Sequence, residues 1–287
     1  MPIFAVRDDD INAFTEAAML RRVYLDDLSF LRPSLCLTPL AGEVYRKILE
    51  NETSLPTRED KLRFAGSMAS NVARATNHWR RNHQILPVLK ELLSRGSEIC
   101  LHGVNHNPTE IGFECESPAP DVNAVRTLVN EIESELDTTI RVFSPPNNSI
   151  VTEWLDLLYE CNLSMVTSVG VRPNECGWVP DALLSILRIL PMHLVSKGRD
   201  RSWSVCCYRS VKTVQSLPIS VFSKKADVLA ALRSAHRRNR DFVLAIHSYQ
   251  FNEPNALYEL FVEVCEEART IGYDFGTISE ILDRDKA

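Results

Sequence analysis

Near its start the chain reads Phe4-Ala-Val-Arg-Asp-Asp-Asp-Ile11, an apolar run that leads directly into three adjacent carboxylates. Residues 3–6 predict a short buried strand, so the acidic triplet falls where a parallel strand gives way to its loop. In α/β sheets and barrels that end of the strand carries the chemistry. Three adjacent carboxylates repel one another, and a shared cation or proton relieves the repulsion. The triplet alone is equally consistent with a helix cap at Asp10 or Asn12 and two solvated carboxylates.

A second apolar run ends in polar residues at Glu98-Ile-Cys-Leu-His102-Gly-Val-Asn-His106. Its two imidazoles are four residues apart, and four steps of about 100° would place both on one side of a helical turn. Neutral imidazole is the commonest metal ligand, and one carboxylate with two imidazoles forms a three-ligand set that leaves positions open for water and substrate. The alternative is a pair of polar loop residues, one of which caps a helix. The spacing after a strand favours the metal site.

The strand that ends in paired aspartates and the later strand that ends in His102-Gly-x-x-His106 together resemble the polysaccharide deacetylase superfamily, the NodB-homology enzymes. Val142-Phe-Ser-Pro-Pro-Asn-Asn148 looks like the family's third motif, a strand followed by a proline-containing loop that lines the sugar site. Leu244-Ala-Ile-His-Ser248 looks like the last motif, a strand that ends in a catalytic histidine. The matches span residues 3–248. The resemblance implies an α/β fold, a distorted (β/α) barrel of about seven parallel strands, with metal-dependent amidohydrolase activity.

Two departures from the family pattern distinguish this chain. Ile11 replaces the usual glycine after the paired aspartates, and Ser144-Pro145-Pro146 stands where the third motif usually has an arginine before its proline. The Phe143-x-Pro-Pro146 loop and the Arg7-x-Asp-Asp10 start resemble a divergent branch that includes deacetylase-like proteins of surface-polysaccharide and O-antigen biosynthesis. The family's fourth motif, an acidic and aromatic pair, has no identified counterpart. The departures therefore bear more on the substrate than on the metal.

The resemblance also implies a role for each motif residue. The expected set is Asp9 and His247 as catalytic base and acid, Asp10, His102 and His106 as metal ligands, and Pro145, Pro146, Asn147 and Asn148 as substrate-binding residues. By ligand type the metal is expected to be Zn²⁺, with Co²⁺, Ni²⁺ or Fe²⁺ as replacements.

Length and composition predict one globular domain. A chain of 287 residues can bury one sizeable core, and 45% hydrophobic with 24% charged residues is typical of a globular protein. We expect a single domain over residues 1–287 with a helical insertion near residues 50–82. The net charge of −6, from 32 basic and 38 acidic residues, argues against a nucleic-acid-binding or anionic-membrane-binding protein, since such proteins need a basic face.

Three further features predict a cytoplasmic protein. In the N-terminal segment the first charged residue is Arg7, so the apolar stretch before it is too short for a signal peptide. No apolar run approaches the roughly 20 residues of a membrane helix. The eight cysteines have no Cys-x-x-Cys spacing, which favours free thiols in a reducing compartment.

Strand and helix signals alternate along most of the chain. Predicted helices cover residues 13–24, 42–49, 84–94, 122–136, 151–161, 226–237 and 254–272, and predicted strands cover 34–38, 139–143, 163–167, 216–222, 241–247 and 273–275. This order implies a parallel sheet with covered faces. Residues 170–215 are less regular, with strand candidates at 187–190 and 205–208. Glu110 and Glu114, in the polar loop after His106, are expected to be solvated rather than to support the histidines.

The function that the resemblance implies is removal of an N-acyl group, first of all an N-acetyl group, from a sugar or polysaccharide precursor in surface-polysaccharide synthesis. A cytoplasmic enzyme would meet a nucleotide-linked or lipid-linked saccharide, and Arg199 and Arg201 are candidates to hold its phosphate. Two alternatives stay open. One is a deformylase or other C–N amide hydrolase on the same scaffold, and the other is a catalytically inactive carbohydrate-binding relative.

Overall fold

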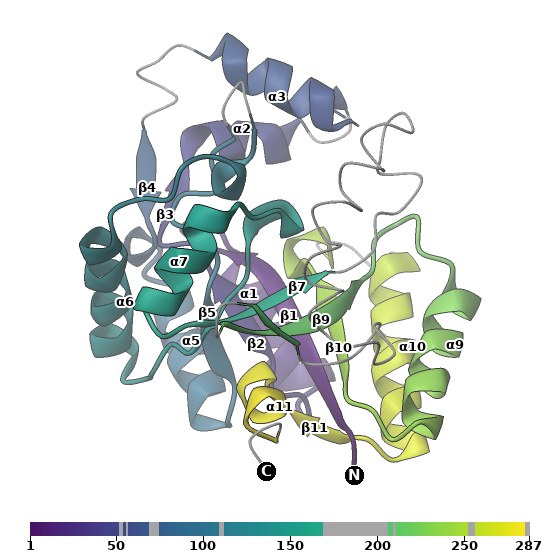
Figure 1. The fold of residues 1–287 in the computed structure, drawn as a ribbon. Helices are drawn as coiled ribbons and strands as arrows, with labels where there is room; N and C mark the ends of the chain where they lie inside the picture. The colour runs from purple at the N-terminus through teal and green to yellow at the C-terminus, as the bar shows by residue number, and fades with distance from the viewer. Residues whose placement is uncertain are drawn as a thin grey trace.

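Seven parallel strands close into a barrel (Figure 1). The computed structural model describes residues 1–51, 54–55, 57–68, 75–108, 112–168, 206–208, 211–251 and 256–284. Around the barrel the order is β1 (Ile3–Ile11), β2 (Ser34–Leu37), β5 (Glu98–Leu101), β6 (Val142–Phe143), β7 (Ser164–Ser168), β9 (Val211–Pro218) and β10 (Phe242–Ile246). Because β10 pairs in parallel with both β9 and β1, the sheet closes on itself. The predicted (β/α) barrel is confirmed.

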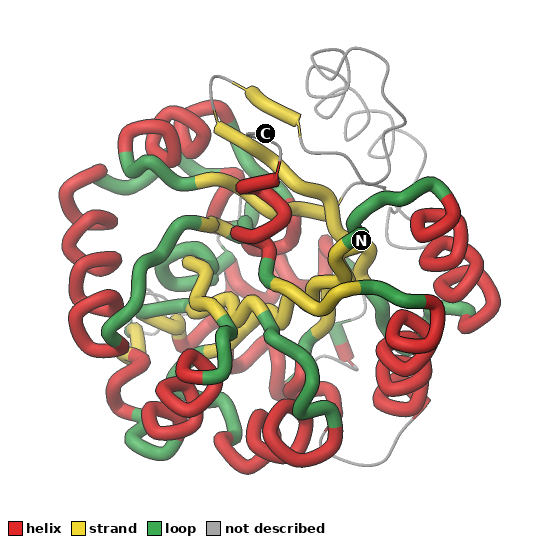
Figure 2. The backbone as a smooth tube through the Cα atoms, turned by 90° about the horizontal axis from the view of Figure 1, so that it is seen from below, coloured by secondary structure: helices red, strands yellow, loops and turns green. Residues whose placement is uncertain are grey.

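Helices surround the strands in the view from below (Figure 2). Their bounds are α1 (Ala17–Arg21), continued by the π-helix η1 (Arg22–Asp27), α2 (Glu43–Glu50), α3 (Arg58–Ser67), α5 (Ile85–Ser94), α6 (Val122–Leu136), α7 (Thr152–Glu160), α9 (Lys225–Arg237), α10 (Ala256–Ile271) and α11 (Ile278–Arg284). Most of them connect consecutive barrel strands, as parallel neighbours require. The helices predicted at 84–94, 122–136 and 226–237 agree with α5, α6 and α9 within one residue.

Further strands lie outside the barrel. β3 (Leu40–Gly42) pairs antiparallel with β4 (Thr76–His78), β8 (Cys206–Tyr208) pairs antiparallel with β9, and β11 (Asp274–Gly276) adds to β1 in parallel. In the region of the insertion predicted near residues 50–82, the described residues hold α3 and β4, and α3 lies above α2 at the top of Figure 1. The extent of a single domain over residues 1–287 stays a prediction.

β1 is longer than predicted and includes the whole acidic triplet. Arg7 and Asp8 have parallel backbone partners in both β2 and β10. The ladder with β2 shifts register between Asp8 and Ile11, and Asp10 has a φ of 68° in this irregularity. Pairing on both sides at Arg7 and Asp8, and with β2 again at Ile11, therefore continues the strand through residues whose side chains disfavour it. The predicted strand end at Val6 is wrong.

Two other predicted elements are displaced. The helix predicted at 13–24 begins later, as α1, because Asn12 accepts the N–H of Thr15 and holds these residues in a turn. The strand predicted at 216–222 is wrong in position: β9 ends at Pro218, and a turn follows at residues 220–223.

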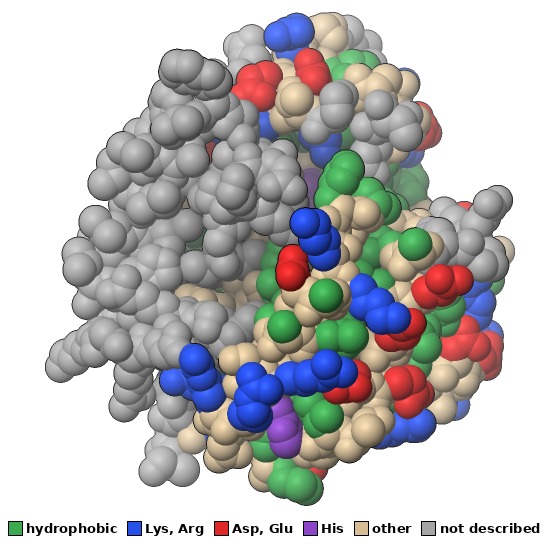
Figure 3. All heavy atoms as spheres, turned by 90° about the vertical axis from the view of Figure 1, so that its right-hand side faces the viewer, with side chains coloured by type: hydrophobic (Ala, Val, Ile, Leu, Met, Phe, Trp, Pro, Cys, Tyr) green, Lys and Arg blue, Asp and Glu red, His purple; other side chains and the backbone are tan. Residues whose placement is uncertain are grey.

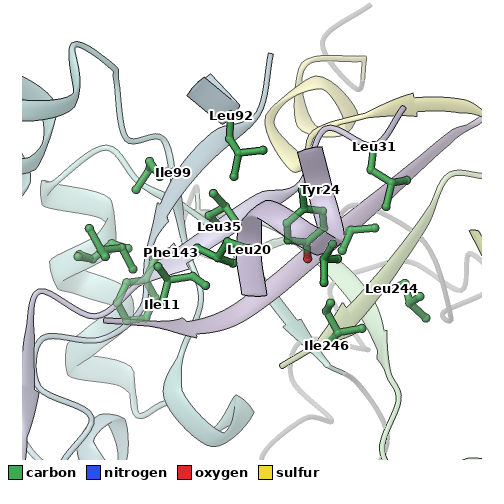
Figure 4. Close-up of a cluster of buried hydrophobic side chains, with 14 of the residues drawn as sticks. Ile11, Leu20, Tyr24, Leu31, Leu35, Leu92, Ile99, Phe143, Leu244 and Ile246 are labelled. Carbon is green, nitrogen blue, oxygen red and sulfur yellow. The ribbon is translucent and has the colours of Figure 1, made fainter. Parts of the chain in front are cut away.

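Two buried clusters lie on the two faces of the barrel sheet. The first contains side chains from several barrel strands and from α11, which is the composition of a barrel interior. Its members are Ile3, Ala5, Cys36, Cys100, Val142, Val166, Val214, Val243, Ile278, Ile281 and Leu282. The second lies between the strands and the surrounding helices, and Figure 4 shows part of it, including Leu20 and Tyr24 near β1.

The two-residue repeat of β1 places its polar residues on different faces. Arg7 and Asp9 follow Ala5 toward the barrel interior, where they contact each other. Asp8 points outward, and the hydroxyl of Tyr24 in η1 donates a hydrogen bond of 2.8 Å to it. All residues of β1 are buried, so each of these charges needs a protein partner.

The side of the molecule that carries α9 and α10 has a surface of mixed charge (Figure 3). Ion pairs between Lys225 and Glu263 and between Arg233 and Glu267 link the two helices. Across the described ranges, no helix combines the length and the apolar character needed to cross a bilayer.

Candidate active site

The C-terminal ends of the barrel strands bring the motif residues together. Asp9 and Asp10 lie at the end of β1, His102 follows β5, the loop of residues 144–148 follows β6, and His247 follows β10. Parallel barrel strands all end at the same rim, so segments far apart in the sequence converge there. The rim therefore combines carboxylates from one strand with imidazoles from two others.

Asp10, His102 and His106 form a group that could hold a metal ion. One candidate ligand atom from each residue lies within 4.8 Å of the others. The Oδ1 atom of Asp10 is 3.1 Å from Nε2 of His102 and 3.1 Å from Nε2 of His106, and all three residues are buried. Burial would raise the pKa of Asp10, but His106 and His102 outweigh this effect and hold its pKa well below the usual range. A carboxylate and two imidazoles that converge in this way fit a divalent cation.

Ser144 orients the ring of His102. The Nδ1 atom of His102 lies 2.9 Å from the carbonyl oxygen of Ser144 and 3.2 Å from its hydroxyl. Because a carbonyl oxygen can only accept, Nδ1 of His102 carries a proton, which leaves Nε2 as the ring nitrogen that faces Asp10 and is available to a cation. Metal-binding histidines are typically held by such a partner on the other ring nitrogen.

An irregular loop joins His102 to His106, so the predicted helical turn is wrong. Gly103 and His106 have positive φ angles of 62° and 56°. A Cβ on Gly103 would lie 2.4 Å from Oε2 of Glu114 and 2.6 Å from Cγ of Pro146. Glycine is therefore required both by the backbone conformation and by the lack of space.

Glu114 is buried against this loop, so the prediction of a solvated carboxylate is wrong. Its Oε1 accepts the N–H of Val104 at 2.8 Å and of Asn105 at 3.0 Å, and its Oε2 accepts the N–H of His106 at 2.7 Å. These charge-assisted hydrogen bonds replace the water that the carboxylate loses on burial, and they fix the backbone of a candidate ligand. Glu110 lies outside the described residues.

We expect Glu114→Gln to weaken zinc binding roughly 10–100-fold, the usual cost of losing a partner that orients a metal ligand. Glutamine offers one acceptor oxygen where the carboxylate offers two, so at least one loop N–H loses its partner. Titration calorimetry with Zn²⁺ measures the change, and Glu153→Gln, at an exposed glutamate of α7, is the matched control. Equal affinity in the Glu114 variant and the parent would contradict this role.

Arg7 holds Asp9 in a buried ion pair with two hydrogen bonds. Its Nε donates to Oδ1 of Asp9 at 2.8 Å, and its Nη2 donates to Oδ2 at 2.6 Å. The Nη1 atom of Arg7 donates to Oδ1 of Asn148 and to Oγ of Ser216. Burial would raise the pKa of Asp9, but the Arg7 guanidinium outweighs this effect, so the pKa lies below its usual range. Asp9 is thus a carboxylate at neutral pH.

His247 is the most accessible histidine at this rim. Its side chain is 34% exposed, against 2% for His102 and 10% for His106. Its Nε2 lies 3.4 Å from Oδ2 of Asp10, so a group that reaches the metal ligands from solvent would also meet His247.

Asp8 links β1 to the segment that follows β10, which carries His247. Its Oδ1 accepts the N–H of Ser248 at 2.9 Å, while its Oδ2 accepts the hydroxyl of Tyr24. Burial raises the pKa of Asp8 to about 7, against the lowering effect of the hydrogen bonds from Ser248 and Tyr24.

The four predicted substrate-binding residues lie in different environments. Pro145 and Pro146 are buried, and Asn148 is partly buried with its side-chain oxygen bound to Arg7. Of the four, Asn147 alone is exposed. The loop therefore presents Asn147 to solvent, while Asn148 supports the Arg7–Asp9 pair.

Tyr45 of α2 contacts the site although no sequence pattern indicated it. Its ring lies against the ring of His106, with centroids 4.3 Å apart and planes inclined by 39°. Burial and the negative charge of Asp10 raise the pKa of Tyr45 well above its usual value.

Comparison of the sequence with family models and with curated proteins found no match. Among solved structures, the chain is similar to the Xyl-CE4 domain of a multidomain xylanase from the hindgut metagenome of Trinervitermes trinervoides, with 12% identity and a TM-score of 0.49 over 100% of this chain and 92% of that one. A family 4 acetyl xylan esterase from Clostridium thermocellum, in complex with a cobalt ion, shows 11% identity and a TM-score of 0.44 over 99% and 92% of the two chains. A CE4 family pseudoenzyme from Bacillus anthracis shows 14% identity and a TM-score of 0.44 over 98% and 66%.

Proposed function

We propose that this chain is a metal-dependent hydrolase that removes an N-acyl group, in the first instance an N-acetyl group, from a sugar. The observation that carries the proposal is the position of Asp10 Oδ1, which lies 3.1 Å from Nε2 of both His102 and His106. Asp9 and His247 flank this group at the barrel rim. The set combines a cation site with a base and an acid, which amide hydrolysis requires.

The three candidate ligands would hold one divalent ion, with zinc favoured by ligand type and cobalt, nickel or iron as replacements. When bound, such an ion supplies Lewis acidity, which lowers the pKa of water and polarises a carbonyl oxygen. Ser144 and Glu114 keep the two imidazoles in place for it.

Asp9 and His247 divide the proton transfers between them. Asp9 accepts a proton from the water that attacks the amide carbonyl, and Arg7 holds its carboxylate in position. His247, in its protonated form, donates a proton to the amine nitrogen as the C–N bond breaks. The products are the amine and the carboxylic acid. An amine leaves poorly unless it is protonated, so the accessible imidazole is as necessary as the buried carboxylate.

The proposed substrate is an N-acetylated sugar linked to a nucleotide or a lipid carrier, used in surface-polysaccharide or O-antigen synthesis. The motif order along the sequence supports this class, and the exposed Asn147 amide at the rim could bind sugar hydroxyls. Arg199 and Arg201, the candidate phosphate ligands, lie outside the described residues.

The test incubates the zinc-loaded protein with UDP-linked and lipid-linked N-acetyl sugars and measures released acetate. Parallel reactions with N-formyl sugars measure released formate, which separates a deacetylase from a deformylase. His247→Ala is the control and should lose most of the activity. Failure to release any acyl group from the panel, or full activity in His247→Ala, would overturn the proposal.

Asp9→Asn should reduce turnover roughly 10²-fold or more, the usual scale for a general base. Zinc affinity should stay within about an order of magnitude of the parent, because Asp9 is not among the candidate ligands. Asp10→Asn is the matched comparison and should lose the metal. Steady-state kinetics and zinc titration on both variants measure the difference. If Asp9→Asn loses the metal and Asp10→Asn keeps it, Asp9 is the ligand and Asp10 is the base.

A further inference from the structure

The first turn of α2 is fixed to the loop that carries His106. The N–H groups of Leu40 and Gly42 donate to the carbonyl oxygens of Val104 and Asn105, at 2.9 Å and 2.8 Å. The N–H of Tyr45 donates to the side-chain oxygen of Asn107 at 3.1 Å. Tyr45 is therefore placed relative to His106 by backbone hydrogen bonds as well as by the contact between the two rings.

The hydroxyl of Tyr45 is buried, and within the described part of the chain no partner lies at hydrogen-bond distance from it, although Asp10 is close enough to act on it. The residue is 3% exposed. Burying a hydroxyl without a partner is unfavourable, and most buried polar atoms in proteins are paired. What sets the Tyr45 hydroxyl apart is its place beside the candidate metal ligands, where a bound ligand would supply the missing partner.

The surroundings of the hydroxyl indicate the chemistry of that ligand. Its ionisable neighbours include Asp10 and Tyr249, and its own ring rests on His106. It thus lies beside two of the three candidate metal ligands. Since a cation at that site attracts an oxygen with negative charge, an O–H donor beside it suits the oxygen of an acyl group or a carboxylate.

We propose that the Tyr45 hydroxyl donates a hydrogen bond to the acyl oxygen of the bound ligand, both in the acylated sugar and in the carboxylic acid that is released. This inference rests on the proposed function and extends it to the residue that recognises the acyl group. Hydrogen bonds to an oxygen that gains negative charge during a reaction accelerate it, and loss of one such donor typically costs roughly 10²–10³-fold in turnover.

The test compares Tyr45→Phe with Tyr273→Phe. Tyr273 is also buried, but it lies beside Phe4 at the opposite end of β1, and its hydroxyl donates to the carbonyl oxygens of Leu232 and Arg240. Each variant is first loaded with zinc, and its metal content and melting temperature are measured. Acetate is then titrated into parent and variants by calorimetry.

Tyr45→Phe should bind one zinc ion, melt at the same or a higher temperature than the parent when metal-free, and bind acetate roughly tenfold or more weakly. Tyr273→Phe should melt at a lower temperature and bind acetate like the parent. Opposite effects on stability and on binding distinguish a ligand donor from a structural hydroxyl.

Acetate affinity in Tyr45→Phe equal to that of the parent would overturn the inference and leave the proposed function intact. Absence of acetate binding in the zinc-loaded parent would overturn it as well, and so would a Tyr45→Phe variant that loses metal or stability. If the parent binds no zinc, the proposed function itself fails and the inference falls with it.

Discussion

Replacing His102 with alanine should reduce bound divalent metal from about one ion per chain to background. The imidazole supplies one of three converging ligand atoms, and Ser144 already holds its ring in the metal-binding tautomer. We expect the zinc affinity to fall by more than roughly 100-fold. Loss of a residue that only orients a metal ligand costs up to about 100-fold, and loss of the ligand itself should cost more. Elemental analysis of protein reconstituted with zinc measures the stoichiometry.

His83→Ala is the matched control for this experiment, because His83 is an exposed histidine outside the barrel rim. It should bind zinc like the parent. Zinc should also raise the melting temperature of the parent and of the control, since a ligand that binds the native state stabilises it, and should leave His102→Ala unchanged. Zinc binding by His102→Ala that matches the parent would show that the metal lies elsewhere.

Replacing Arg7 with methionine should destabilise the metal-free protein by about 3–5 kcal/mol, the usual cost of breaking a buried ion pair by removing one partner. Arg7 is fully buried, and the variant leaves the carboxylate of Asp9 without its two hydrogen bonds. Urea unfolding measures the loss. Arg21→Met breaks an exposed pair with Glu91 and should cost at most about 1 kcal/mol.

A double variant separates the effect on stability from the effect on catalysis. Arg7→Met combined with Asp9→Asn removes both buried charges, so we expect it to recover part of the lost stability. It should stay as inactive as Asp9→Asn because the base is absent. If Arg7→Met alone is as stable as the parent, the Arg7–Asp9 ion pair does not contribute to the free energy of unfolding as its burial predicts.

The parallel sheet could be predicted because strands such as residues 99–101 and 242–246 are apolar runs buried on both faces, whereas the barrel was expected from the family resemblance. The extension of β1 through Asp8, Asp9 and Asp10 could not, because strand propensity argues against charged residues. Pairing with β2 and β10 at Asp8, and again with β2 at Ile11, continues the strand past these residues, and Asp10 has a positive φ in the irregularity between the two positions. The predicted end of the strand at residue 222 is wrong because Val221 and Phe222 have strand-forming side chains but lie exposed after β9.

The motif residues Asp10, His102 and His106 could be selected from the sequence, although the reason first given for the two histidines, a helical turn, is wrong. The supporting residues could not be selected. Arg7 and Asn148 meet across 141 positions of sequence, and Tyr45 reaches His106 from a different segment. Such contacts arise only when the barrel brings the strand ends together.

The most direct test of the metal site is anomalous diffraction at the zinc absorption edge from crystals of the reconstituted protein. We predict one strong peak at the C-terminal rim of the barrel, at about 2.0–2.2 Å from a carboxylate oxygen of Asp10 and from Nε2 of His102 and His106. The absence of a peak at that rim, or a peak ligated by other side chains, would contradict the assignment.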